Sequence, residues 1–495
     1  MLPAIPDLRD IRRYGVSLKN GFLPDVLPLT RLPDPYYNKW EAVMTNLQAL
    51  ILSRRLRGVI DRLPVLSTIG LEDEAEWRRA YMMLCFMAHA YIWGDDQPEE
   101  KLPPCISAPL LEVSKHLELP PVATYAAVCL WNFKPLFIDE DIDNLENLST
   151  LNTFTGSLDE SWFYLVSVAI ESKGAPSIGL MLKAIQAVRD NDPDTVASCL
   201  RRLAELLTDL TTLLERMHER CAPFVFYNQI RPFLAGSRNM GDAGLPNGVL
   251  YEDARGYTEY RQYAGGSNAQ SSLIQFFDIA LGVSHRPTGQ KSDSSASGTS
   301  TKHSFMEEML QYMPGGHARF LQDVELVANI REYVHANAAV YPQLSLSYDA
   351  CIAMLSAFRD KHINIVTRYI IIPSRESRPP RAHSPEAKRN AVNIATSSRK
   401  LNMAAANESE ARKKLTGTGG TALIPFLKQA RDETGEVAAE TWARKFMKRQ
   451  GKPEGRNDFF LGKTETETGL EPEKGLDVAG LAGAWSTSEG GICHY

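Results

Sequence analysis

Long apolar runs, paired cysteines and a surplus of basic residues are all missing from this chain of 495 residues. No apolar run reaches the about 18 residues that a membrane-spanning helix needs, so no membrane association is expected. The N-terminus lacks a basic start followed by an apolar stretch, so no secretory signal is predicted. The formal net charge of −6 argues against nucleic acid as a partner. Together these absences predict a cytoplasmic protein.

The cysteines also exclude some metal sites. None of the seven forms a Cys-x-x-Cys pair, and their number is odd. Zinc and iron–sulfur ligation are therefore not indicated, and reduced thiols fit a cytoplasmic location. The cysteines are Cys85, Cys105, Cys129, Cys199, Cys221, Cys351 and Cys493.

Alternation with a period of two residues is also scarce, whereas helical periodicity dominates. Apolar side chains recur at helical spacing across residues 37–62, 72–93 and 192–220. The third of these stretches begins with Asp192 followed by a proline, which is a typical helix start. Apolar residues make up 44% of the chain and charged residues 23%, as in ordinary globular proteins. The pattern predicts an all-α fold without a substantial sheet.

His362 has the most informative surroundings. It lies near the end of a predicted helix that we expect Pro373 to terminate. A lone imidazole on an apolar helix face can ligate a haem iron, and Arg359, one turn earlier, could reach a haem propionate. The same pattern is typical of an ordinary core histidine, which the pattern alone favours. The apolar residues on this face are Phe358, Ile365, Val366 and Tyr369.

The order and spacing of several short segments favour the interpretation of His362 as a haem ligand over that of an ordinary core histidine. The segments are SWFYLVS at 161–167, YNQIRPFLAG at 227–236, AGGSNAQSS at 264–272, YMPGGHARFL at 312–321, the His362 helix and GTGGT at 417–421. Each segment is weakly specific, whereas the ordered set is highly specific. Over roughly residues 10–430 the chain resembles the indoleamine 2,3-dioxygenase family, in a fungal-type version with a longer C-terminus.

The resemblance implies a definite chemistry. It implies a haem b enzyme, ferrous when active, that uses O2 to cleave the indole 2,3-bond of L-tryptophan and yields N-formyl-L-kynurenine. This is the first step of the kynurenine route and of de novo NAD synthesis. It also implies a monomer that relies on an unidentified electron donor. Two alternatives stay open: a haem oxygen carrier or sensor on the same fold, and a weakly active regulatory paralogue.

The resemblance also implies how the substrate is held. Phe163 and Ser167, four residues apart on one helix, would line the distal pocket, with Phe163 on the indole and Ser167 as the hydroxyl near the iron. Phe226 would pack on the indole, and Arg231 would pair with the substrate carboxylate. Without the ordered set, an ordinary buried helix face and a surface arginine before a proline would explain these residues.

Further positions follow from the same resemblance. Gly265 and Gly266 would let the backbone pass close to the haem, and Ser267 would face the substrate. Tyr125 and Cys129 would form the deeper pocket wall. Taken alone, Gly-Gly-Ser is more often a plain linker. Relatives often carry alanine at the position of Asn268, which leaves the local polarity of the pocket open.

Two more residues complete the predicted site. Asp278 would pair with Arg359 and so support the propionate contact, and Thr418 would point inward from a glycine-rich loop that closes over the substrate. The GTGGT segment also suggests a phosphate-binding loop. It lacks the Lys-Ser/Thr pair that a P-loop requires, so that interpretation is rejected.

The predicted organisation has five parts. Residues 374–415 carry ten Lys and Arg against four Asp and Glu, with few large apolar residues, which indicates a solvated loop more than a site for an anionic partner. A mobile loop is also expected at 285–303. The parts are a small helical domain (1–118), a large haem-binding catalytic domain (119–373), a flexible basic loop (374–415), the glycine-rich substrate loop with a final helix (416–450) and a flexible tail (451–495).

Overall fold

The computed structural model describes residues 3–288, 305–376, 418, 423–440, 443, 444 and 447, and the short stretches 478–480 and 483–485. Residues 1–451 form one compact unit, and residues 452–495 form a second. The predicted boundary near Leu119 stays a prediction. Most of the predicted loops at 285–303 and 374–415, and most of the tail at 451–495, lie outside the described residues.

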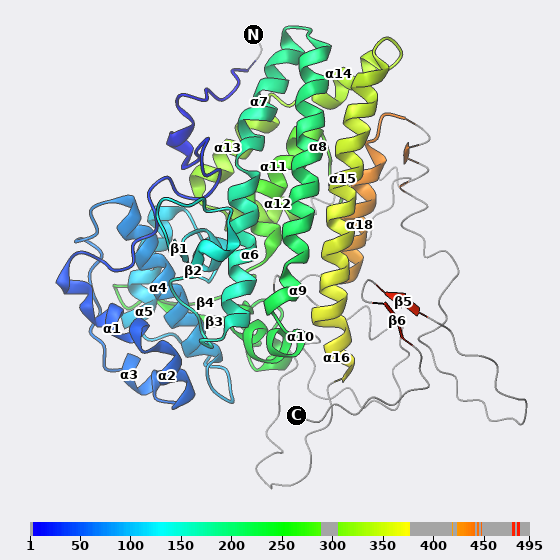
Figure 1. Cartoon of the computed structure of the whole chain (residues 1–495). Helices are drawn as coiled ribbons and strands as arrows, with labels where there is room; N and C mark the ends of the chain where they lie inside the picture. Colours follow the sequence, from blue (N-terminus) through cyan, green and yellow to red (C-terminus); the bar gives the residue numbers. More distant parts are fainter. Residues whose placement is uncertain are drawn as a thin grey trace, which may run out of the picture. The chain divides into compact units, whose positions relative to one another are not determined.

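Helices dominate the described part of the first unit, as the periodicity predicts (Figure 1). The α-helices are α1 (Asn38–Thr45), α2 (Leu47–Leu52), α3 (Leu56–Ile60), α4 (Glu74–Trp93), α5 (Pro104–Leu117), α6 (Leu158–Gly174), α7 (Pro176–Arg189), α8 (Pro193–Glu215), α9 (Met217–Arg220), α10 (Pro223–Val225), α11 (Ser272–Leu281), α12 (Phe305–Met309), α13 (Gly315–Glu325), α14 (Ile330–Asn337), α15 (Pro342–Val366), α16 (Ile372–Glu376) and α18 (Leu423–Glu436).

Short helical turns connect these helices. The 3₁₀ turns are η1 (Ile11–Tyr14), η2 (Pro35–Tyr37), η4 (Leu145–Asn147), η6 (Arg231–Leu234), η7 (Gly241–Ala243), η8 (Asn268–Gln270) and η9 (Leu310–Tyr312). Three further turns are π-helical: η3 (Ala126–Leu130), η5 (Phe226–Ile230) and η10 (Thr367–Ile371).

Strands occur only as small antiparallel pairs among the described residues. β1 (Phe133–Pro135) pairs with β2 (Leu148–Thr150), and Phe133 faces Thr150. β3 (Val249–Glu252) pairs with β4 (Thr258–Arg261). In the second unit, β5 (Val478–Gly480) pairs with β6 (Gly483–Trp485). The expectation of no substantial sheet is confirmed for the part of the chain that the structure describes.

Helix α8 lies at the centre of the larger helical region, flanked by α6, α7 and α15, and α18 packs on α15 (Figure 1). The buried face of α8 is a row of leucines at helical spacing, which removes a continuous apolar stripe from water. Cys351 of α15 donates from its thiol to the Leu200 carbonyl of α8, with a sulfur–oxygen distance of 2.7 Å. The long helices therefore form one rigid scaffold for α15, which carries His362.

The helix start read at Asp192 is confirmed, and α4 begins with a cap of the same kind. Asp73 caps α4 by accepting from the backbone N–H groups of Ala75 and Glu76. Asp192 caps α8 by accepting from the Thr195 N–H, and a proline fills the first helical position. The helices predicted at 72–93 and 192–220 are thus confirmed, the latter as α8 followed directly by α9.

Two expected helix boundaries are wrong. Residues 37–62 form three short helices, because the chain turns after α1 at Asn46 and takes a left-handed conformation at Arg54 (φ 55°) before α3. Pro373 does not terminate the His362 helix. The π-helical turn η10 leads into α16, and Pro373 occupies the first turn of that helix, where a proline is tolerated.

One helical stretch, Leu158–Arg189, is long and apolar enough to cross a membrane by length and composition, with 67% of its apolar window buried inside the protein. It comprises α6 and α7 and includes the fully buried carboxylates Glu160 and Glu171. Mostly buried core helices of soluble proteins have the same composition, so the stretch is weak evidence for a membrane span.

Candidate active site

A cavity lies between α6, α15, α18 and the turns that precede α11. It has two adjoining lobes that share His362, Tyr125, Ser167 and Asn268 as lining residues. The first lobe collects most of the side chains that the sequence singles out: Tyr125, Cys129, Phe163, Ser167, Phe226, Arg231, Gly266, Ser267, His362 and Thr418. Arg359 lines the second lobe. Gly265 and Asp278 do not line either lobe and lie directly behind the wall.

All three π-helical turns of the described chain contribute to this wall. They bring Val128 and Cys129, Phe226, and Tyr369 and Ile370 to the first lobe. A π-turn inserts one residue into the helical repeat, so it changes the direction in which the following side chains point, and such turns are frequent at functional sites. The irregular turns therefore direct side chains from three separate segments into one space.

His362 projects from the last turns of α15 into both lobes. Its neighbours Ile365, Val366 and Tyr369 line the first lobe, and Phe358 lines the second, so the predicted apolar face is confirmed. Burial, with a smaller effect of Arg359, lowers the pKa of His362 to about 4. The imidazole is therefore neutral at physiological pH, which is the form that can donate a nitrogen lone pair to a metal.

The other histidines of similar context are engaged elsewhere. His317 lies 3.2 Å from the Ser272 hydroxyl through Nδ1 and 3.3 Å from the Gly15 carbonyl through Nε2. His335 contacts the Val437 carbonyl at 3.3 Å. Both are thus bound within the protein, whereas His362 has no hydrogen-bond partner among the described residues and faces a cavity.

Aromatic rings form one wall of the first lobe. The centroids of Phe163 and Phe226 are 4.8 Å apart with planes inclined at 55°, and Tyr369 meets Phe226 edge-on at 5.8 Å. Ser167 lies one turn after Phe163 on α6 and adds a hydroxyl to this otherwise apolar wall. A flat apolar molecule fits against such rings, because offset and edge-on contacts favour aromatic partners.

Arg231 is the cationic residue of the first lobe. It begins η6, directly after the π-helical turn η5, and its side chain is 2% exposed. Its guanidinium carbon lies 5.8 Å from the centre of the Tyr227 ring. Burial lowers the pKa of Arg231 to about 10, so it remains charged at neutral pH. A carboxylate entering the cavity would meet a buried guanidinium beside aromatic rings.

The two glycines have different surroundings. A Cβ on Gly265 would come within 2.1 Å of the Leu234 carbonyl oxygen, so the missing side chain lets two backbone segments cross. Gly266 lines the cavity. The Thr418 hydroxyl donates to the Gly266 carbonyl at 2.6 Å, and the Thr418 backbone carbonyl accepts from the Gly265 N–H at 3.0 Å. Gly265 therefore serves backbone packing, and Gly266 and Thr418 reach the cavity.

Arg359 and Asp278 form a buried bidentate pair. The Arg359 Nη2 lies 2.7 Å from Asp278 Oδ1 and 2.6 Å from Asp278 Oδ2. Burial raises the pKa of Asp278, but Arg359 and His285 outweigh it and hold that pKa below its usual value. The pair fixes the guanidinium beside the second lobe, on the same helix as His362 and one turn earlier.

Glu171 was missed by the sequence analysis. It is fully buried and accepts from the Tyr125 hydroxyl at 3.0 Å and the Ser271 hydroxyl at 2.6 Å through Oε1, whereas Oε2 has no partner among the described residues. Burial raises its pKa to about 7. A signal was available, because Glu171 follows Ser167 by four residues on the same face of α6. The carboxyl anchors two residues of the cavity wall.

We expect Glu171 to make stability depend on pH. Between the ordinary pKa of 4.5 and about 7, the unfolded chain loses a proton that the folded chain keeps. The free energy of unfolding should therefore fall by about 1.4 kcal/mol per pH unit across this window. Glu171→Gln should lack this fall, as measured by denaturant unfolding of both proteins at several pH values. Parallel pH profiles for the two proteins would contradict the assignment.

The donor set fits a haem better than a metal held by side chains alone. Within the described ranges, no group of three or more His, Cys, Asp or Glu side chains is arranged to hold a metal ion. The cavity instead offers one neutral imidazole, aromatic and aliphatic walls, and a guanidinium in the second lobe. A planar iron macrocycle with acidic side groups supplies the remaining iron ligands itself and needs such a pocket.

Comparison with known proteins agrees with this geometry. The sequence model described as "Indoleamine 2,3-dioxygenase" matches residues 10–437. An indoleamine 2,3-dioxygenase of Saccharomyces cerevisiae is 45% identical over 436 residues, covering 86% of this chain and 92% of that protein. A 6-hydroxytryptophan 2,3-dioxygenase of Fusarium equiseti is 38% identical, covering 86% and 97%, and indoleamine 2,3-dioxygenase 2 of Mus musculus is 32% identical, covering 86% and 94%. The chain is therefore a dioxygenase that belongs to the indoleamine 2,3-dioxygenase family.

Proposed function

We propose that this protein binds haem b, with His362 as the protein ligand to the iron, and cleaves the indole 2,3-bond of L-tryptophan with O2 to give N-formyl-L-kynurenine. The reaction would begin the kynurenine route and supply de novo NAD synthesis. The observation that carries the proposal is one cavity that combines a neutral imidazole, an aromatic wall and the buried cation Arg231.

Separate groups of residues would bind the haem and the indole ring. The haem supplies oxygen activation when it is bound. His362 would hold the iron, and Arg359, fixed by Asp278, would pair with a propionate. Phe163 and Phe226 hold the indole plane. The apolar walls exclude water from the reacting atoms.

Other side chains of the first lobe would bind the amino-acid part of the substrate. Arg231 would form the carboxylate pair, because a carboxylate buried without a cation costs several kcal/mol. Ser267 and Thr418 line the same lobe and supply polar atoms near the substrate backbone. An oxygen carrier would have no use for a cation at this position, which is why we favour an enzyme over a haem oxygen carrier or sensor.

The protein would work as a cytoplasmic monomer, with an electron donor of unknown identity that keeps the iron ferrous. Tryptophan and 6-hydroxytryptophan should both be assayed, because one relative is named for the hydroxylated substrate. Tyr125 and Cys129 line the same lobe and would form its deeper wall, where a ring substituent would be sensed.

An absorption spectrum of the purified protein before and after dithionite and carbon monoxide tests the cofactor. We expect a Soret band that shifts on reduction and again on addition of carbon monoxide. Turnover of tryptophan to N-formyl-L-kynurenine then tests the activity. A haem protein that binds O2 reversibly without turnover would instead be a carrier or a regulatory paralogue.

A further inference from the structure

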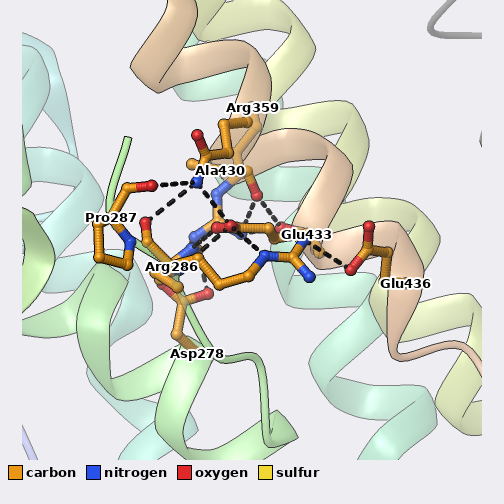
Figure 2. Close-up of polar contacts among 10 residues, drawn as sticks. Asp278, Arg286, Pro287, Arg359, Ala430, Glu433 and Glu436 are labelled. Atoms are coloured by element: carbon orange, nitrogen blue, oxygen red, sulfur yellow. Dashed lines mark hydrogen bonds and ion pairs between the residues drawn. The ribbon is translucent and has the colours of Figure 1, made fainter. Parts of the chain in front are cut away.

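A network of buried and half-buried charged and polar side chains joins three helices behind the second lobe, and we call it the His285 network (Figure 2). Its members come from α11, from the segment that follows α11, from α15 and from α18. They are Asp278, His285, Arg286, Arg359, Gln429, Glu433, Thr434 and Glu436. The catalytic assignments above use only Asp278 and Arg359.

His285 is at the centre of this network, and each of its ring nitrogens faces a carboxylate. Nε2 lies 3.0 Å from Asp278 Oδ2, and Nδ1 lies 2.8 Å from Glu433 Oε2. The side chain of His285 is 8% exposed, and the two carboxylate side chains are 5% and 3% exposed. A neutral imidazole can donate from only one nitrogen, so both contacts are satisfied only when the ring carries two protons.

The surrounding charges also favour the imidazolium. The network contains three carboxylates. Asp278 from α11 and Glu433 from α18 face the ring, and Glu436 from α18 pairs with Arg286. Two guanidiniums oppose them, Arg359 from α15 and Arg286 from the same segment as His285. A protonated ring makes the positive and negative charges equal.

The pKa values of His285 and Glu433 change in the directions that this charge balance favours. Burial opposes the charged ring, but Asp278 and Glu433 outweigh burial and raise the pKa of His285. Burial likewise opposes the Glu433 carboxylate, but the hydrogen bond from His285 and those from Gln429 and Arg286 hold its pKa below the usual value. A further cation, Arg331 of α14, donates to the Gly282 carbonyl at the start of the segment, at 2.8 Å.

The network fixes α18 against the cavity. Arg359 donates to the Thr434 hydroxyl and, at 3.5 Å, to the Ala430 carbonyl. Glu433 accepts from the Arg286 N–H at 3.1 Å and from the Gln429 amide at 2.8 Å. Phe426, Leu427 and Ala430 of the same helix line the second lobe. The helix that closes this side of the cavity is thus held by the carboxylate that His285 contacts.

We propose that His285 is a positioning residue that acts as a pH-dependent latch: its protonated ring ties α18 to Asp278 and Arg359, and loss of the proton releases α18 from the cavity. The latch itself depends only on the contacts described here. Its effect on haem retention rests on the proposed function, because Arg359 is then shared between the latch and a propionate.

The direction of the pH effect depends on which groups have a raised pKa in the folded protein and which have a lowered one. A histidine with a raised folded-state pKa contributes stability below the ordinary value of about 6.5, and that contribution is lost as the pH rises through the folded value. Asp278 and Glu433, with lowered pKa values, lose theirs only in acid. The latch is therefore closed below the ordinary histidine pKa and opens as the pH rises through the raised pKa of His285.

Hydrogen–deuterium exchange of the full-length, cofactor-free protein tests the latch directly. The backbone protection of Leu423–Glu436 should decrease between about pH 6 and about pH 9, after correction for the intrinsic pH dependence of exchange. His285→Gln should exchange about tenfold faster or more at the lower pH and should show little pH dependence. The protection of α8 serves as the internal reference for global unfolding.

Two further variants make the result specific. His285→Lys keeps a charged donor that does not titrate near neutral pH, so it should restore part of the protection without the pH dependence. His116→Gln removes a surface imidazole that contacts Glu74 at 3.1 Å and should behave as the wild type. Protection of α18 that is independent of pH in the wild type, or unchanged in His285→Gln, would refute the latch.

Haem transfer to excess apomyoglobin provides the second measurement. The rate of haem loss should increase with pH in the wild type and should be high at all pH values in His285→Gln. If the wild type binds no haem, the proposed function fails while the exchange experiment still decides on the latch. If haem loss is the same in both proteins while α18 exchange differs, the latch does not control haem retention.

Discussion

Replacement of His362 by alanine should yield a folded protein that binds little or no haem. The ring is the neutral imidazole that faces both lobes without a hydrogen-bond partner among the described residues, and burial holds its pKa at about 4. Loss of the ligand itself should lower haem affinity by more than the about tenfold to hundredfold seen when only its supporting residues are lost. The measurement is the Soret absorbance per mole of protein after reconstitution with haem.

Added imidazole sharpens this test, because the alanine variant leaves a space where a free imidazole can bind the iron. Imidazole should restore a Soret band in His362→Ala and should have little effect on the wild type. His335→Gln is the matched control, since His335 contacts the Val437 carbonyl and the Tyr348 ring and lies outside the cavity. A full and unshifted Soret band in His362→Ala would show that the iron ligand lies elsewhere.

Replacement of Arg231 by alanine should impair tryptophan turnover while the haem spectrum stays unchanged. Arg231 is 2% exposed and lines the lobe that also contains Phe163 and Phe226. A charge-assisted hydrogen bond contributes about 1.5–3 kcal/mol, so kcat/KM for tryptophan should fall by about tenfold or more. An indole without a carboxylate should be affected far less, because it does not use the cation.

Two companion variants separate charge from geometry. Arg231→Lys keeps the charge but lacks the planar fork, so it should recover only part of the tryptophan activity. Arg359→Ala, assayed side by side, should instead alter the Soret band, because Arg359 is assigned to the propionate. Normal tryptophan turnover in Arg231→Ala would remove the carboxylate pair and, with it, the main argument for an enzyme over an oxygen carrier.

The sequence by itself determined the features that depend on near neighbours along the chain. The caps at Asp73 and Asp192 and the apolar face around His362 involve residues a few positions apart on one helix. Helical spacing places such residues together whatever the rest of the fold does. The ordered motif set adds the family, and with it the grouping of Phe163, Phe226 and Arg231 that the cavity contains.

Only the tertiary structure decided the features that join distant segments. Glu171 belongs to the site because α6 packs where Tyr125 and Ser271 can donate to it. His285 and Glu433 are 148 residues apart, and their contact depends on how α18 packs on α15. No local periodicity contains that information, because a charged residue looks the same in sequence whether it is solvated or buried. Burial turns such a residue into a constraint, since a charge removed from water must find an opposite charge.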